Sequence, residues 1–131
     1  MIIDNIPLRV HKNKKTLISL NLNNYRNNHF QVNNSIKKKV HKIIRDLCGR
    51  IDDKIPCLPL ELEYTIYRKD KRRIDLGNIG SIVDKYVSDA LVMCGLIPDD
   101  NTDYIKAIRY IDGGIDKNCP RATLEIRHYE K

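Results

Sequence analysis

Three aspartates and a lysine of the kind used in phosphodiester chemistry are concentrated between residues 72 and 100. Asp75 precedes a predicted helix, Lys85 lies within it, and Asp99 and Asp100 follow it. Carboxylate oxygens are the ligands that Mg²⁺ and Mn²⁺ prefer, and a metal ion held by them activates water. A nearby lysine neutralises charge that develops on a phosphate. As a set, these residues predict a Mg²⁺-dependent catalytic site with Mn²⁺ as the alternative metal, although each alone is typical of an ordinary turn or surface ion pair.

The helix that positions these groups has the strongest helical pattern in the chain. Apolar residues from Ile79 to Cys94 recur at helical spacing, and Gly95 ends the pattern. The start is open, because a capping box begins at Ser81 whereas the periodicity begins near Asn78. A straight helix over this range is about 25 Å long. The acids at its two ends can therefore meet only if the following loop doubles back, the helix is shorter, or a second subunit contributes.

The helical wheel separates two candidate oxygen ligands. Asn78, Lys85 and Asp89 share one stripe of the helix, and Asp84 lies on the other flank of the apolar face. Asn78 is therefore a candidate metal ligand beside Asp75. Asp84 is a candidate only if the helix begins late, near Ser81.

The charge distribution predicts a polyanionic partner. The chain has 131 residues and a net charge of +7, and residues 1–50 carry 11 Lys or Arg against 2 Asp. A basic half of this kind attracts nucleic acid, although many basic domains bind none. After a predicted strand at residues 15–20, an asparagine-rich run at residues 21–34 is either a surface loop or a loop that contacts DNA. The candidate DNA-binding residues are Asn23, Asn24, Tyr25, Arg26, Lys37, Lys38, Lys39, Arg72 and Arg73.

The order of predicted elements indicates an α+β fold. A helix capped by Asn34 or Ser35 and ended by Gly49 follows the polar run, and residues 60–67 alternate as a half-buried strand. Two further strands are expected at about residues 104–112 and 121–129. We therefore predict a single domain over residues 1–131, in which a mixed sheet of about four strands packs against two helices.

The remaining features are those of a cytoplasmic protein. The four cysteines have no metal-binding or redox spacing and are expected to be reduced thiols. No apolar run approaches the roughly 20 residues that cross a bilayer, and the N-terminus has no signal-peptide pattern. We expect no membrane association.

The central motif also resembles that of RusA-type Holliday junction resolvases. The matching residues are Asp75-Leu-Gly-Asn78, then Lys85-x-x-x-Asp89-Ala-Leu, then Gly95-Leu-Ile-Pro-Asp99-Asp100. The family pattern is D-x-D-N, K-x-x-x-D-A-L and G-x-x-x-D-D at similar spacing. Asn23-Asn24-Tyr25-Arg26 agrees more loosely with the family's asparagine- and tyrosine-rich loop, and the similarity covers nearly the whole chain.

This resemblance implies a definite function. Members are small homodimeric endonucleases, often encoded by phages or prophages, that use Mg²⁺ to nick opposed strands of a four-way DNA junction. By the resemblance, Asp75, Asp99 and Asp100 are metal-binding aspartates and Lys85 is the functional lysine. The chain departs from the family where Gly77 replaces the second aspartate, and the stretch from Asn78 to Asp89 is longer by about one helical turn. Asn78, Asp84 or nothing fills that gap, and the last case favours a non-catalytic dimer that binds branched DNA or RNA.

Overall fold

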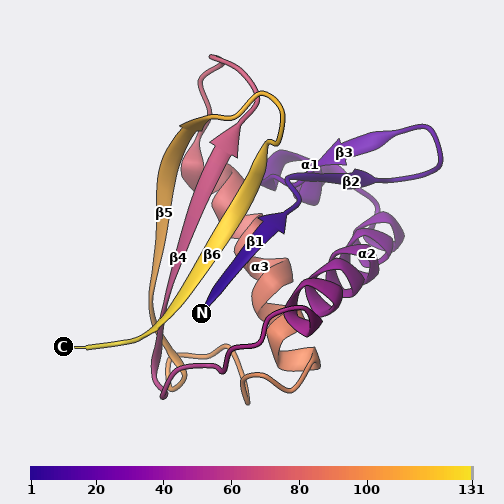
Figure 1. Ribbon diagram of the computed structural model, residues 1–131. Helices are drawn as coiled ribbons and strands as arrows, with labels where there is room; N and C mark the ends of the chain where they lie inside the picture. Colours follow the sequence, from indigo (N-terminus) through magenta and orange to yellow (C-terminus); the bar gives the residue numbers. More distant parts are fainter. Residues whose placement is uncertain (131) are drawn as a thin grey trace.

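The computed structural model, which describes residues 1–130, confirms the α+β fold with a four-stranded mixed sheet (Figure 1). The sheet has the order β1-β6-β4-β5, in which β4 and β5 run parallel and the other pairs are antiparallel. A separate hairpin is formed by β2 and β3 and projects from the body of the molecule. The elements are β1 (Ile2–Ile6), β2 (Arg9–His11), β3 (Leu17–Ser19), α1 (Leu22–Asn27), α2 (Phe30–Gly49), β4 (Leu60–Arg68), α3 (Leu76–Met93), β5 (Ile105–Ile115) and β6 (Arg121–His128).

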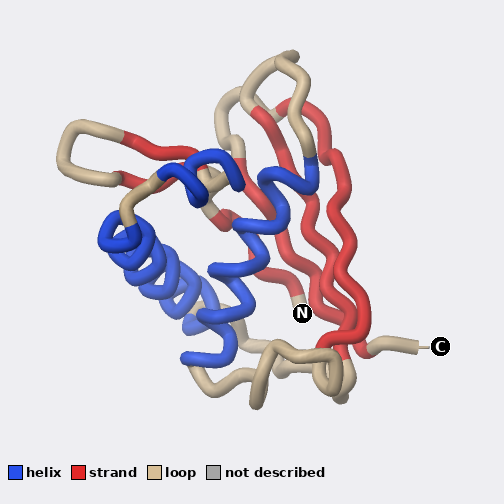
Figure 2. The backbone as a smooth tube through the Cα atoms, turned by 180° about the vertical axis from the view of Figure 1, so that it is seen from behind, coloured by secondary structure: helices blue, strands red, loops and turns tan. Residues whose placement is uncertain are grey.

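The two long helices, α2 and α3, lie together on one face of the sheet (Figure 2). Alternation in β4 explains this arrangement, because Leu62, Tyr64 and Ile66 point toward the helices and are fully buried. The opposite face of β4 is polar, and Glu61 and Glu63 there both pair with Arg127 of β6. The sheet therefore has one apolar face, which the helices cover, and one charged face.

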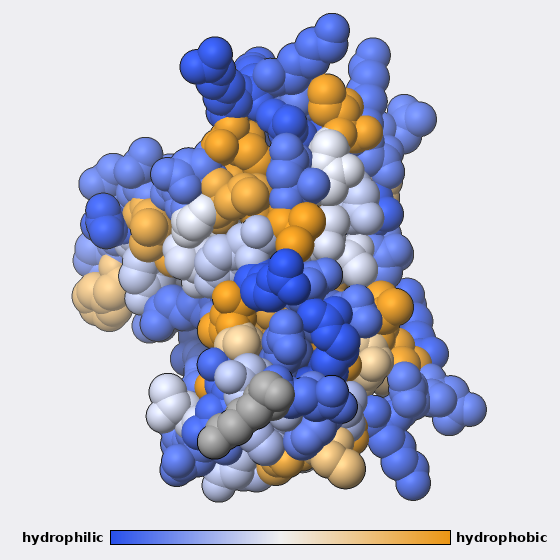
Figure 3. Space-filling view, turned by 90° about the vertical axis from the view of Figure 1, so that its left-hand side faces the viewer, coloured by the Kyte–Doolittle hydropathy of each residue, from blue (hydrophilic) through white to orange (hydrophobic). Residues whose placement is uncertain are grey.

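Helix α3 is the crossover between the parallel strands β4 and β5 and packs closely on β5. Gly80 permits this approach, since a Cβ there would lie 2.5 Å from Cδ1 of Tyr110. Figure 3 faces the β5 side of the molecule, where apolar patches alternate with charged side chains. Ile108 and Ile115 of β5 are among the exposed apolar residues.

The N-terminal strand prediction was wrong in part. Within residues 15–20 only Leu17–Ser19 form a strand, and it belongs to the hairpin and not to the main sheet. The fourth strand of the sheet is β1, which the sequence did not predict. Its register shifts between Ile3 and Ile6, and Asn5 has a positive φ of 62°, so its buried residues do not alternate. The irregular backbone hides the strand pattern.

The helix start predicted at Asn34 or Ser35 was also wrong. Of the two alternatives for the start of α3, Ser81 was wrong and the one near Asn78 lies close to the observed start. Helix α2 begins at Phe30, where the amide of Asn33 donates to the carbonyl oxygen of Tyr25 at 2.9 Å. The side-chain amide thus bonds to the preceding turn and does not interrupt the helix. Helix α3 begins at Leu76, with Asp75 as its N-cap. The other predicted elements agree with the structure within a few residues, and α2 ends at Gly49 as expected.

All four cysteines are free thiols, as predicted. Burial raises the pKa of the half-buried Cys48 thiol to about 11, and the nearby Cys94 contributes to the increase. Neutral thiols of this kind react slowly, which agrees with a structural role for Cys48.

Candidate functional site

An open groove forms where α1 lies across the first turns of α3. Its walls include Asn23 and Arg26 from α1 and Asp75, Asn78 and Ser81 from the start of α3, and its volume is about 640 Å³. The structure thus brings together two motifs that lie about 50 residues apart in the sequence. The groove contains a guanidinium group, side-chain amides and a carboxylate, which is a combination suited to a phosphate-containing ligand.

Hydrogen bonds from asparagine side chains fix α1 in this position. Asn21 caps α1 by accepting from the backbone N–H of Asn24 at 2.8 Å, and the amide of Asn24 donates to the Ser19 carbonyl oxygen at 2.9 Å. Oδ1 of Asn78 accepts from the backbone N–H of Leu22 at 2.9 Å. The predicted loop at residues 21–34 is therefore two helical segments, because Asn21 caps α1, His29 caps α2 and the amide of Asn33 joins the two helices. The side chains of Asn24 and Asn78 therefore stabilise the position of α1.

Lys85 lies next to the groove in a second depression between α1, α2 and α3. Its ammonium group is 5.6 Å from the centre of the Tyr25 ring, which is within the range of a cation–π contact. Lys37 and Asp89 line the same depression and form an ion pair at 3.1 Å. The predicted stripe of Asn78, Lys85 and Asp89 is confirmed as the face of α3 that meets α1 and α2. Asp89, however, pairs with Lys37 and not with Lys85.

The acids at the two ends of α3 do not meet within one chain. Asp75 caps the N-terminus of α3, where its Oδ1 accepts from the backbone N–H of Asn78 at 3.2 Å. Asp99 and Asp100 lie in the loop that follows the C-terminus of this helix, which is 18 residues or about 27 Å long. Oδ1 of Asp99 accepts from the backbone N–H of Asp100 at 2.7 Å, as in a tight turn. The loop brings Asp100 near Asp84 in the middle of α3, but within residues 1–130 the two acids do not form a metal-binding group with Asp75.

Asp84 lies on the opposite flank of α3 and does not fill the gap at Gly77. Its Oδ1 accepts from the buried hydroxyl of Tyr64 at 2.7 Å and from Ser88 at 2.8 Å. Burial raises the pKa of Asp84 above its usual value, and the Asp100 carboxylate raises it further. Since α3 begins at Leu76, the condition under which Asp84 would join Asp75 is not met. Its contacts are those of a structural acceptor between α3 and the interior strand β4.

The predicted metal ligands do not form one cluster in the described part of a single chain. Within residues 1–130, no three His, Cys, Asp or Glu side chains gather in an arrangement that could hold one. Asp75 is the only carboxylate in the groove wall, and Oδ1 of Asn78 already accepts a hydrogen bond from the backbone N–H of Leu22. A complete site would need carboxylates from outside this groove.

The remaining candidate DNA-binding residues fall into separate places. Lys39 donates to the carbonyl oxygen of His11 at 2.6 Å, whereas Lys38 is exposed on another side of α2. Arg72 and Arg73 lie in the turn that leads to Asp75, and this turn forms the wall of a further pocket. Arg9 of β2 lines that pocket too and was missed, because a lone arginine in a basic N-terminal half gives no distinguishing signal.

Comparison with known proteins gives no family for this chain, since neither a scan against protein-family profiles nor a search of curated proteins found a match. Within the described residues, no helix is both long enough and apolar enough to cross a membrane. The features of the chain that bear on function are therefore the geometry of the groove and the sequence motif.

Proposed function

We propose that this protein is a RusA-type endonuclease that binds four-way DNA junctions and nicks them in a Mg²⁺-dependent reaction. The observation that carries the proposal is the groove in which Asn23 and Arg26 of α1 face Asp75 and Asn78 of α3. Taken separately, the α1 motif and the α3 motif support the resolvase interpretation only through their sequences. Their meeting at one groove supports a common role in holding a DNA strand.

Several side chains in and beside the groove attract phosphate, and one side chain repels it. Arg26 and the amide of Asn23 can contact a phosphodiester, and Lys85 adds positive charge nearby. The exposed carboxylate of Asp75 opposes phosphate binding unless a cation neutralises it. A carboxylate in this position is more useful to an enzyme that employs a cation than to a protein that only binds DNA.

The nuclease proposal requires a second copy of the chain. Because Asp99 and Asp100 lie at the other end of α3, a partner subunit would have to bring them to Asp75. A two-fold symmetric dimer would create two such sites in matching orientation, as paired cuts across a four-way junction require. When bound, the metal would supply activation of water and stabilisation of phosphate charge.

A non-catalytic module that binds branched DNA or RNA is the second candidate. The separation of the acids along α3 and the glycine at position 77 favour it. In this case the groove would recognise the nucleic-acid backbone, and the carboxylates would serve only as a helix cap and a loop turn.

Incubation of the purified protein with a synthetic four-way junction and Mg²⁺ distinguishes the two. The enzyme is expected to produce symmetric nicks, and Asp75→Asn should abolish them while binding is retained or tightened, because a negative charge near phosphate is removed. Arg26→Gln should weaken junction binding, whereas the matched control Lys106→Gln, an exposed cation of β5, should not. Junction binding without nicks by wild-type protein in Mg²⁺ or Mn²⁺ would remove the enzyme proposal and leave the module. Binding no tighter to the junction than to linear duplex would remove the enzyme proposal and the branched-DNA form of the module, and the same comparison with a four-way RNA junction tests its RNA form.

A further inference from the structure

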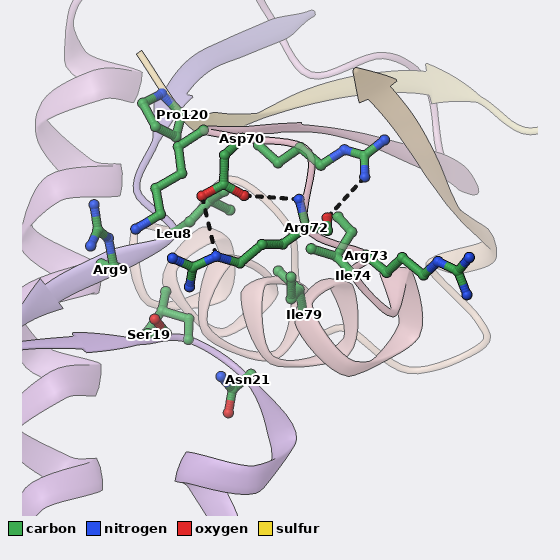
Figure 4. A pocket seen from close by; sticks show the side chains of 13 residues that line it. Leu8, Arg9, Ser19, Asn21, Asp70, Arg72, Arg73, Ile74, Ile79 and Pro120 are labelled. Carbon is green, nitrogen blue, oxygen red and sulfur yellow. Dashed lines mark hydrogen bonds and ion pairs between the residues drawn. The ribbon is translucent and has the colours of Figure 1, made fainter. Parts of the chain in front are cut away.

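A pocket of about 240 Å³ lies beside the groove, between the base of the β2–β3 hairpin, the turn after β4 and the start of α3 (Figure 4). Two of the segments that line the pocket are adjacent in the sequence to segments that line the groove. Asn21, which caps α1, lines the pocket, and Ile74 in its wall immediately precedes Asp75. The pocket is therefore built by the same two segments that hold the groove.

The interior of the pocket is apolar. Leu20, which is 3% exposed, belongs to the hydrophobic core, and the backbone N–H of Leu20 donates to the Leu8 carbonyl oxygen at 2.8 Å to close the hairpin base. Leu8, Ile79 and Pro120 complete an apolar lining around it. Such a surface favours a flat organic group and gives a bare phosphate ion little to bind.

The rim, in contrast, is cationic. Arg9 comes from one side, and Lys69, Arg72 and Arg73 come from the turn after β4. In Figure 4, Arg72 extends across the mouth of the pocket toward Arg9 and Ser19, and Arg73 points away from it. With Arg68 the lining has five cations and one acid, Asp70, which is a net charge of +4, or +3 if Arg73 is left out.

Hydrogen bonds within the turn hold its cations in place. Asp70 accepts from the backbone N–H of Arg72 at 3.0 Å and lies 3.5 Å from the Arg72 guanidinium. Nη1 of Arg68 donates to the carbonyl oxygen of Arg72 at 3.1 Å, and Nη2 of Arg68 pairs with Asp112. The one acid at the rim thus serves to orient Arg72, and Arg68 anchors the turn to β5.

We propose that this pocket accepts one unpaired base of a DNA strand whose phosphates contact Arg9, Lys69 and Arg72. The inference rests on the proposed junction-binding function and extends it to any nucleotide that is unpaired at or near the branch. The volume is below the range of about 300–1,000 Å³ for drug-sized ligands, as suits a single base. Aliphatic side chains and the guanidinium plane of Arg72 would face the base, since none of the lining residues is aromatic.

The energetics agree with a branch point as the source of the base. Extraction of a base from a duplex costs a few kcal/mol and costs least where the base is already unpaired. A pocket that has no aromatic platform gives less stacking energy than one that has it. It therefore selects bases that are already free of the duplex.

The test compares two single strands that carry the same phosphates. Fluorescence anisotropy is measured with a labelled oligothymidylate and with an oligomer of equal length built from abasic sites. Wild-type protein should bind the thymidylate about tenfold more tightly, a difference of about 1.4 kcal/mol. Ser19→Phe places a bulky ring at the pocket from an exposed strand position and should remove the difference without a change in charge. Thr16→Phe is the matched control in the same hairpin and should preserve it.

Equal affinity of wild-type protein for the two strands would overturn the inference, and this comparison needs no variant to fold. Preservation of the preference in a folded Ser19→Phe protein would also overturn it, as would free thymidine monophosphate that binds more tightly than the strand. Parallel titrations with junction and linear duplex separate this inference from the proposed function. A base preference without junction preference would support the pocket and count against the junction proposal, and the reverse result would do the opposite.

Discussion

The contacts of Asp84 allow its structural role to be separated from a catalytic one by two substitutions. Asp84→Ala removes the acceptor shared by the hydroxyls of Tyr64 and Ser88, which are 0% and 3% exposed. A buried hydroxyl left without a partner costs about 1–3 kcal/mol. Ser88 can turn to a backbone carbonyl one helical turn away, so most of the loss comes from Tyr64. We expect Asp84→Ala to lower the free energy of unfolding by about 2 kcal/mol, on the scale of one buried hydroxyl without a partner.

Asp84→Asn should behave differently, because an amide oxygen can accept both hydroxyl protons. Burial raises the pKa of Asp84 in the folded protein, so its ionised form opposes folding at neutral pH. The stability that this group contributes is greatest at low pH and is lost as the pH rises through its folded pKa. At pH 7, Asp84→Asn should therefore be at least as stable as wild type, and it should gain less stability than wild type on acidification.

Urea denaturation at pH 7 and at pH 5 measures both effects. A loss for Asp84→Asn as large as that for Asp84→Ala would refute the argument, because it would show that the charge and not the acceptor is needed. Nicking of junctions by the same variants adds a functional result. Asp84→Asn should retain the wild-type rate if Asp84 is structural, whereas a metal ligand would lose it.

Two further predictions concern packing and pH. Gly80→Ala should lower the free energy of unfolding by about 1–2 kcal/mol, since overpacking against Tyr110 exceeds the gain in helix propensity. A Cβ at Gly77 in the same helix would meet only an ordinary van der Waals contact. Gly77→Ala should therefore be neutral or stabilising by up to about 1 kcal/mol. Thermal unfolding checks the pair, and equal effects of the two substitutions would contradict the packing argument. The hydrogen bond from Thr123 is the main reason that the pKa of Asp4 is lowered. The stability that Asp4 contributes should therefore be present above the pKa of Asp4 in the unfolded chain and lost as the pH falls through its pKa in the folded protein. Asp4→Asn should reduce this acid sensitivity in urea titrations between pH 5 and pH 2, and an unchanged pH profile would exclude the role.

The sequence predicted those parts of the fold that regular periodicity encodes. Helix α3 and strand β4 were found because their buried residues follow helical and alternating spacing. Strand β1 was missed because the left-handed Asn5 breaks its alternation. The asparagine-rich segment was expected to be irregular, yet Asn21 caps α1 and Asn33 bonds back to Tyr25. Asparagine side chains, which favour turns, here cap and join helices because neighbouring segments supply hydrogen-bond partners.

The candidate site was predictable as a set of residues but not as an arrangement. The wheel placed Lys85 and Asp84 on different flanks of α3, and the structure agrees. It could not show that Arg26 and Asp75 would line the same groove, because that placement depends on how α1 docks on α3. The cationic pocket was also hidden, since its lining comes from five separate parts of the chain.

Mixing two inactive variants shows whether the nuclease site is shared between subunits. Asp75→Asn and Asp100→Asn are each expected to be inactive on a four-way junction with Mg²⁺. In a mixed dimer that shares its sites, one site combines both substitutions and the other has both aspartates intact. Random mixing should therefore restore about one quarter of the wild-type sites, with single nicks in place of paired ones. Wild-type nicking without any recovery in the mixture, after subunit exchange is verified, would contradict the shared site.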